Sequence, residues 1–152
     1  MAMSAPLYLL DTGILLALVR GGQLGKHVER TYQLKSQNQR PLASIVSKAE
    51  IRVLAASRDW GGTKKDALEN LLANVVLVDV NSDEVIDAYV EVDLFSRQWG
   101  AGPIKMGKND LWVAATAKVT RARLLTTDKD FDHLDGVLLT RDYFDPEGDY
   151  PE

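Results

Sequence analysis

The sequence predicts an α/β fold in which helices cover both faces of a mostly parallel central sheet. Short apolar segments alternate along the chain with longer stretches whose apolar residues recur at helical spacing. This alternation is typical of parallel strands joined by helices. A length of 152 residues suits one domain, and the chain shows no internal repeat. We therefore expect a single α/β domain.

The N-terminal part of the chain is expected to form a buried strand followed by two helices. The apolar run Leu7–Leu10 ends in a turn at Asp11, which predicts a strand with an acid at its carboxyl end. A helix is expected from Ile14 to Val19 and a second from His27 to Gln37. The expected inward-facing residues of the second helix are Val28, Tyr32 and Leu34.

The middle of the chain continues the alternation. An extended segment at Pro41–Ser44 precedes an amphipathic helix that begins near Ile45 and carries Glu50. A helix that Thr63 can cap is expected to run to Leu72. The segment Val75–Val78 has the apolar, β-branched composition of a buried strand.

The next part adds two helices and another strand. A helix is expected from Ser82 to about Trp99, followed by a glycine-rich connector at 100–103. A further helix is expected to begin near Asp110, and the strand Arg123–Thr126 follows it. Asp128 comes just after this strand, so a second acid lies at a strand's carboxyl end.

The chain is expected to finish with an extended run at Val137–Leu139 and an acidic tail. The predicted domain covers residues 1–141, and residues 142–152 are expected to be loose. Five of the 22 acidic residues lie in this tail, whereas all 18 basic residues precede it. The overall net charge of −4 therefore becomes +1 for residues 1–141. Bulk charge neither favours nor excludes a nucleic-acid partner.

Composition excludes several classes of chemistry. The absence of cysteine rules out disulfide bonds, thiolate zinc sites and a cysteine nucleophile, and it is compatible with the cytoplasmic location that we expect. The apolar segments at the start of the chain are split by Asp11 and Gly13 and are too short to span a bilayer. We expect no membrane association.

Four acidic residues are candidates for binding a metal ion: Asp11, Glu50, Asp110 and Asp128. In open α/β sheets the ligand site lies beyond the carboxyl ends of the strands, where Asp11 and Asp128 are expected. Asp110 and Glu50, each on a helix, would complete an all-oxygen site that suits Mg²⁺ or Mn²⁺ rather than zinc. Such a site leaves coordination positions for water and a phosphate, so we expect it to support phosphodiester hydrolysis.

Each of these acids also has a purely structural explanation. Asp11 suits a turn, Asp110 can cap a helix, and Asp128 can start a short helix. Glu50 lies on an amphipathic helix, where an acidic residue is usually solvated. The residues taken singly therefore leave both explanations open.

Read in order, four motifs resemble the PIN-domain family, in particular its VapC-like toxins. They are Asp-Thr after the first strand, Ser-Lys-Ala-Glu-Ile within a helix, Asp-Leu-Trp-Val-Ala-Ala at a helix start, and Leu-Leu-Thr-Thr-Asp-Lys-Asp-Phe around the last strand. The resemblance covers roughly residues 7–139. It implies a single PIN-like domain with nuclease activity.

The resemblance also assigns roles to residues of this sequence. It implies that Asp11, Glu50, Asp110 and Asp128 are the catalytic, metal-binding acids. It further implies that Thr126 positions a carboxylate or a water. The family's Thr-x-Asp spacing selects Asp128 over its neighbour Asp130, and we expect Asp130 to face solvent.

Substrate contacts are expected from residues near the acids. Lys105 and Lys108 flank the approach to Asp110 and can contact a phosphate backbone, although lysines are more often simply solvated. Thr12 can contribute a hydroxyl group beside the first acid, or can serve the turn. Trp99 and Trp112 can stack on a base, but their apolar neighbours favour core packing.

The resulting hypothesis is a divalent-metal-dependent endoribonuclease that acts as the toxin of a type II toxin–antitoxin pair. The resemblance implies cleavage of structured RNA such as transfer RNA, a cognate antitoxin protein as partner, and a homodimer. One alternative is a non-catalytic PIN-like module that binds RNA or protein. A less favoured one is a phosphatase of the haloacid-dehalogenase type, which needs a second Asp where this chain has Gly13.

Overall fold

The central element of the fold is a parallel sheet of five strands. The computed structural model describes residues 6–36 and 38–151. Within them the strands lie in the order β3-β2-β1-β4-β5, and every neighbouring pair is parallel. The strands are β1 Tyr8–Leu10, β2 Leu42–Ser44, β3 Val76–Val78, β4 Arg123–Thr126 and β5 Thr140–Tyr143. The predicted parallel α/β sheet is confirmed.

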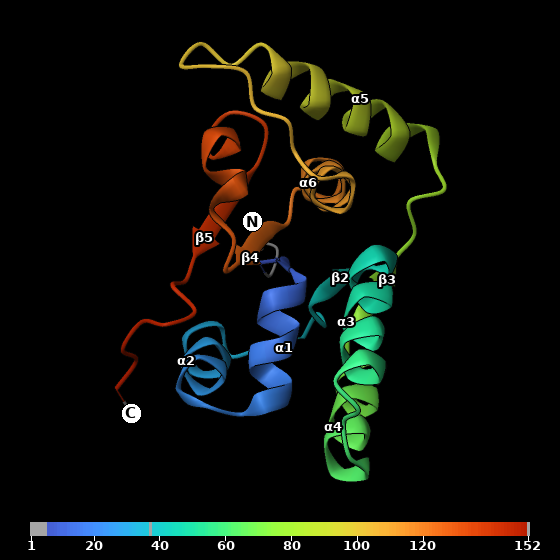
Figure 1. The fold of residues 1–152 in the computed structure, drawn as a ribbon, viewed down its shortest axis with the longest axis vertical. Coiled ribbons are helices and arrows are strands. Elements are labelled where there is room, and N and C mark those ends of the chain that lie inside the picture. Colours follow the sequence, from blue (N-terminus) through green and yellow to red (C-terminus); the bar gives the residue numbers. More distant parts are fainter. Residues whose placement is uncertain (1–5, 37, 152) are drawn as a thin grey trace.

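Helices connect the strands and cover both faces of the sheet (Figure 1). They are α1 Thr12–Arg20, α2 Gln23–Tyr32, α3 Ile45–Ser57, α4 Gly62–Ala73, α5 Asp83–Arg97, α6 Lys108–Thr120 and the 3₁₀ helix η1 Lys129–Leu134. No helix in the described part of the chain is long and apolar enough to cross a membrane.

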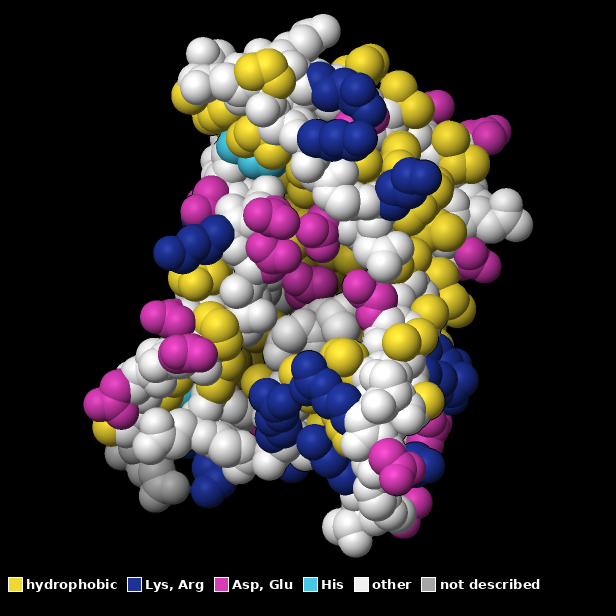
Figure 2. Space-filling model, viewed as in Figure 1, with side chains coloured by type: hydrophobic (Ala, Val, Ile, Leu, Met, Phe, Trp, Pro, Cys, Tyr) yellow, Lys and Arg dark blue, Asp and Glu magenta, His cyan; other side chains and the backbone are white. Residues whose placement is uncertain are grey.

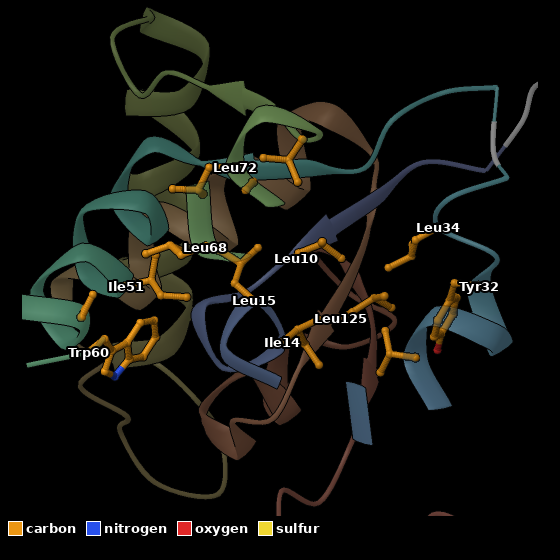
Figure 3. Packing of buried hydrophobic residues seen from close by; sticks show 14 residues of the cluster. Leu10, Ile14, Leu15, Tyr32, Leu34, Ile51, Trp60, Leu68, Leu72 and Leu125 are labelled. Atoms are coloured by element: carbon orange, nitrogen blue, oxygen red, sulfur yellow. The ribbon is translucent and has the colours of Figure 1, made fainter. Parts of the chain in front are cut away.

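The strands supply adjacent residues to two separate cores, because successive side chains of a strand point to opposite faces. Leu10 and Leu125 pack with the apolar residues of α1, α2, α3 and α4, as Figure 3 shows. Their neighbours Leu9 and Leu124 pack on the other face, against α6, α5 and η1. All four leucines are fully buried. Both cores hold the sheet's central strands in place.

Two sequence predictions about strands were wrong. The segment around Val76 was expected to be buried, but β3 is an edge strand, and Val76 is 41% exposed. The last extended run was expected at Val137–Leu139, but Val137 and Leu138 form a turn with Gly136, whose φ is +77°, and Leu139 forms an isolated β-bridge with Asp135. The strand β5 begins only at Thr140.

The end of the chain packs more closely than the predicted boundary at residue 141 suggests. Strand β5 extends to Tyr143, so residues 142 and 143 belong to the sheet. The Tyr32 hydroxyl donates a hydrogen bond to Asp142, which also forms an ion pair with Arg123 at 2.9 Å. Further on, the Tyr150 ring lies 4.9 Å from the ring of His27 on α2.

Helix α2 also differs from its prediction, although the three residues expected to face inward are buried. The helix ends at Tyr32, before the predicted end at Gln37, which lies outside the described residues. The cause is Gln33, whose φ of 51° is in the left-handed region and stops the helix.

Candidate metal centre

The parallel pairing of β1 with β4 brings two acids to one edge of the sheet. Leu10 lies opposite Leu125 in this pairing. Asp11 follows β1 and caps α1, while Asp128 comes shortly after β4 and caps η1. Because both strands end at the same edge, the two carboxylates face one crevice.

Asp11 is held by two hydrogen bonds to its carboxylate. The Thr12 backbone N–H donates to Oδ1 at 2.8 Å, and the Thr126 hydroxyl donates to Oδ2 at 2.8 Å. Thr126 is fully buried, and Asp11 is only 6% exposed. The Thr12 hydroxyl donates to Glu50 Oε1 at 2.8 Å. This hydrogen bond connects the acid on α3 to the residues that follow β1.

The same hydrogen-bond chain continues toward η1. The Asp128 backbone N–H donates to the Thr126 hydroxyl at 3.0 Å, so this one side chain connects Asp11 with the loop after β4. The Asp130 backbone N–H in turn donates to Asp128 Oδ1 at 2.9 Å. The loop geometry therefore fixes where both acids of the Thr-Thr-Asp-Lys-Asp segment lie.

Three carboxylates come close enough together to share one ion. Oxygen atoms of Asp110, Asp128 and Asp130 all lie within 4.8 Å of one another. Asp110 is in the first turn of α6, and Asp110 and Asp128 are half-buried. A donor set made only of carboxylate oxygens fits a hard divalent cation such as Mg²⁺ or Mn²⁺.

The negative charges of the neighbouring carboxylates repel one another. The pKa of Asp11 is raised from 3.8 to about 6: burial and, to a lesser extent, the charges of Glu50 and Asp128 raise it, while its two hydrogen bonds lower it. Burial and the charges of Asp128 and Asp11 together raise the pKa of Asp110 to about 7. A divalent cation would relieve this repulsion.

The close group contains two of the four acids singled out from the sequence, Asp110 and Asp128, together with Asp130, while Asp11 lies outside it. Glu50 contributes charge to the pKa of both Asp11 and Asp110, although it lies outside the tight group of three oxygens. Asp130 is exposed, as expected, yet it also belongs to that group. Its spacing of two residues from Asp128 was the only available signal, and the sequence could not show that both side chains face the same crevice.

The predicted substrate-binding residues are Lys105, Lys108 and Thr12. Lys105 and Lys108 are exposed, and neither forms an ion pair with any described residue. Lys108 is the first residue of α6 and is therefore close along the helix to Asp110. The Thr12 hydroxyl donates its hydrogen bond to Glu50. Figure 2 shows acidic side chains gathered at a hollow in this face, with Lys and Arg side chains above and below it.

The close contact at Gly13 argues against the phosphatase alternative. A Cβ atom at position 13 would lie 2.0 Å from the Thr127 hydroxyl oxygen. An Asp side chain, which a haloacid-dehalogenase-type phosphatase needs at this place, does not fit there unless the Thr127 side chain moves. Position 13 instead holds α1 tightly against the loop that carries Thr127.

The fold and the site together define a parallel α/β domain with a carboxylate centre at the carboxyl edge of its sheet. This chain belongs to the PIN domain family, whose model matches residues 8–137. The family assignment made from the four motifs is confirmed. No curated protein sequence matches the chain significantly.

Several solved structures of toxin–antitoxin systems share this fold. A chain of VapBC2 from Rickettsia felis, bound to a DNA fragment from its promoter, gives a TM-score of 0.76 at 21% identity, covering 91% of this chain and 99% of that one. A chain of VapBC-1 from nontypeable Haemophilus influenzae gives a TM-score of 0.65 at 26% identity, covering 90% of this chain and 97% of that one. VapBC-5 from Mycobacterium tuberculosis gives 0.63 at 22% identity, covering 92% and 98%. The chain thus has the fold of VapC-like PIN proteins.

The raised pKa of Asp110 predicts how stability depends on pH. Because its folded pKa of about 7 exceeds the ordinary 3.8, the metal-free protein should lose stability as pH rises from about 4 to 7. At pH 8 in EDTA we expect Asp110→Asn to raise Tm by roughly 3 °C, about 1 kcal/mol for a half-buried carboxylate. Thermal unfolding of both proteins checks this, and an equal gain at pH 4.5 would contradict it.

The contact at Gly13 predicts a cost for any side chain there. We expect Gly13→Ala to destabilise the protein by about 1–3 kcal/mol, because the new methyl group displaces Thr127. The matched control is Gly61→Ala, since a Cβ atom at Gly61 meets nothing within 4 Å. Urea unfolding measures both. Equal effects of the two substitutions would contradict the role given to close packing.

Proposed function

We propose that this protein is a divalent-metal-dependent endoribonuclease and the toxin component of a type II toxin–antitoxin pair. The observation that carries the proposal is the carboxylate group of Asp110, Asp128 and Asp130, placed beside Asp11 and Glu50 in a PIN domain. Burial, together with the charges of the other four acids, raises the pKa of Asp110 to about 7, a cost that a non-catalytic scaffold has no reason to retain. This argues against the alternative of a purely binding module.

Each part of the site has a role in the proposed reaction. Asp110, Asp128 and Asp130 would hold Mg²⁺ or Mn²⁺, with Asp11 and Glu50 completing the negative charge around it. A bound ion activates water and offsets charge on the phosphate. Thr126 acts as a positioning residue, because its hydroxyl holds both Asp11 and the Asp128 backbone.

The chain's exposed lysines supply the complementary charge. Lys105 and Lys108, on the segment leading to Asp110, are proposed to bind phosphates of the RNA backbone on either side of the cleavage point. No side chain needs to act as a nucleophile in this mechanism: water would attack the phosphorus and lose a proton, the P–O bond to one nucleotide would break, and the leaving oxygen would take up a proton. Transfer RNA is the proposed substrate class.

The partner is proposed to be a cognate antitoxin protein. The support is that several of the solved structures with this fold are chains of VapBC systems, two of them bound to DNA. We also propose a cytoplasmic location for the protein. Co-expression with the product of the neighbouring gene should yield a stable complex, and failure of every neighbouring product to bind would remove the antitoxin from the proposal.

A homodimer is proposed from apolar residues that remain exposed on two helices. Ile86, Val90 and Leu94 recur every four residues on α5 and are 43–51% exposed. Ile45 and Val53 on α3 are likewise exposed, at 40% and 64%. Two such apolar stripes suit contact with the same surfaces of a second copy.

The nuclease proposal predicts metal-dependent cleavage. With Mg²⁺ or Mn²⁺ the purified chain should cut transfer RNA, and EDTA should abolish cutting. Asp110→Asn should reduce the rate by at least about 100-fold, and Thr126→Val by about 10- to 100-fold. The matched control is Asp66→Asn, which removes an exposed carboxylate on α4. Cleavage that survives Asp110→Asn would assign the activity elsewhere, and a wild type inactive on all RNA tested would favour a binding module.

The dimer proposal predicts the effect of a charge on α5. Val90→Glu should convert a dimer to a monomer in sedimentation velocity at micromolar concentration, because the interface would bury the new carboxylate. Val137→Glu, at a valine that is 60% exposed but lies outside both helices, should leave the dimer intact. A monomeric wild type would refute the dimer.

A further inference from the structure

A second recess adjoins the carboxylate centre. It is a cavity of about 460 Å³, within the usual range of small-ligand sites. Its lining residues are Trp99, Ile104, Lys129, Asp130, Asp132 and His133. Asp130 belongs both to this cavity and to the group of three carboxylates. Any molecule in the cavity therefore lies beside the proposed metal site.

One wall of the cavity is aromatic and held in position. The Trp99 ring lies 5.6 Å from the ring of His133 and 5.5 Å from that of Phe95. The rings of Phe95 and His133 stack with an interplanar angle of 14°. His133 Nε2 is joined to the hydroxyl of the fully buried Ser96 at 2.8 Å. The aromatic rings are thus arranged before any ligand binds.

The charged residues that line the cavity are one lysine and two acids, Asp130 and Asp132. Asp132 is paired with Arg141 at 3.0 Å, so its charge is already offset. The Lys129 ammonium group lies 5.7 Å above the ring of Tyr143 and has no ion-pair partner among the described residues. It is therefore available to a phosphate at the cavity's border.

We propose that this cavity binds an unpaired nucleobase of the RNA, with the base against Trp99 and its phosphate toward Lys129 and the carboxylate centre. The proposal rests on the proposed nuclease function and names the part of the substrate that the chain recognises outside the cleavage point. Aromatic side chains are the usual platforms for single-stranded bases, because every base has a π face. Trp112, by contrast, is partly buried, and its ring packs 4.3 Å from that of Tyr89 against a core cluster.

A first test separates the base from the phosphate. The three tryptophans give three indole N–H signals in two-dimensional NMR, and Trp99→Phe identifies the one from Trp99. In EDTA, adenosine or uridine 5′-monophosphate should shift the Trp99 signal and the ring signals of His133. Ribose 5-phosphate should not. Equal shifts with ribose 5-phosphate, or shifts as large with N-acetylleucine amide, would overturn the proposal in favour of a phosphate or a peptide site.

A second test measures the contribution to RNA binding. In the Asp110→Asn background, which prevents cleavage, Trp99→Ala should raise the Kd for a short single-stranded RNA about tenfold. Trp99→Phe should largely restore binding, and the matched apolar control Val137→Ala should leave the Kd unchanged. An unchanged Kd in Trp99→Ala would refute the proposal. Because binding is measured, failure of this proposal and failure of the nuclease function are separate outcomes.

Discussion

The parallel pairing of β1 with β4 is the constraint on which the carboxylate centre depends. It sets Asp11 and Thr126 at the same edge of the sheet, where the Thr126 hydroxyl can donate to Asp11 and accept from the Asp128 backbone. A single buried hydroxyl group thus joins both strand ends. The helices then add Glu50 through Thr12, and Asp110 from the start of α6.

The carboxylates at the site repel one another, whereas the apolar cores of the domain stabilise the fold. The raised pKa values of Asp11 and Asp110 show that the folded chain holds both carboxylates where their ionised forms are disfavoured. The two apolar cores offset that cost, since the strand leucines beneath the site are fully buried on both faces. Such tension between a stable scaffold and a strained site is common where side chains serve chemistry rather than folding.

Much of the fold and part of the site followed from local patterns in the sequence. Strand β4 was predicted with its observed bounds, and Asp11 and Asp128 were singled out because each follows a strand. The features that the sequence did not predict depend on tertiary structure. The exposure of β3 results from its place at the sheet's edge, and the contribution of Asp130 results from the turn into η1. Trp99 and Trp112 both lie among apolar residues in the sequence, and only the tertiary structure shows that Trp99 lines a cavity while Trp112 packs against a core cluster.

The division of adjacent strand residues between two cores also limits how this protein can change. Leu9 and Leu10 serve opposite faces, as do Leu124 and Leu125. Replacing one leucine by another apolar residue disturbs one face only. Inserting or deleting a single residue in β1 would exchange the two faces and turn the position of Asp11 away from the crevice. We therefore expect these strands to tolerate apolar substitutions better than insertions or deletions.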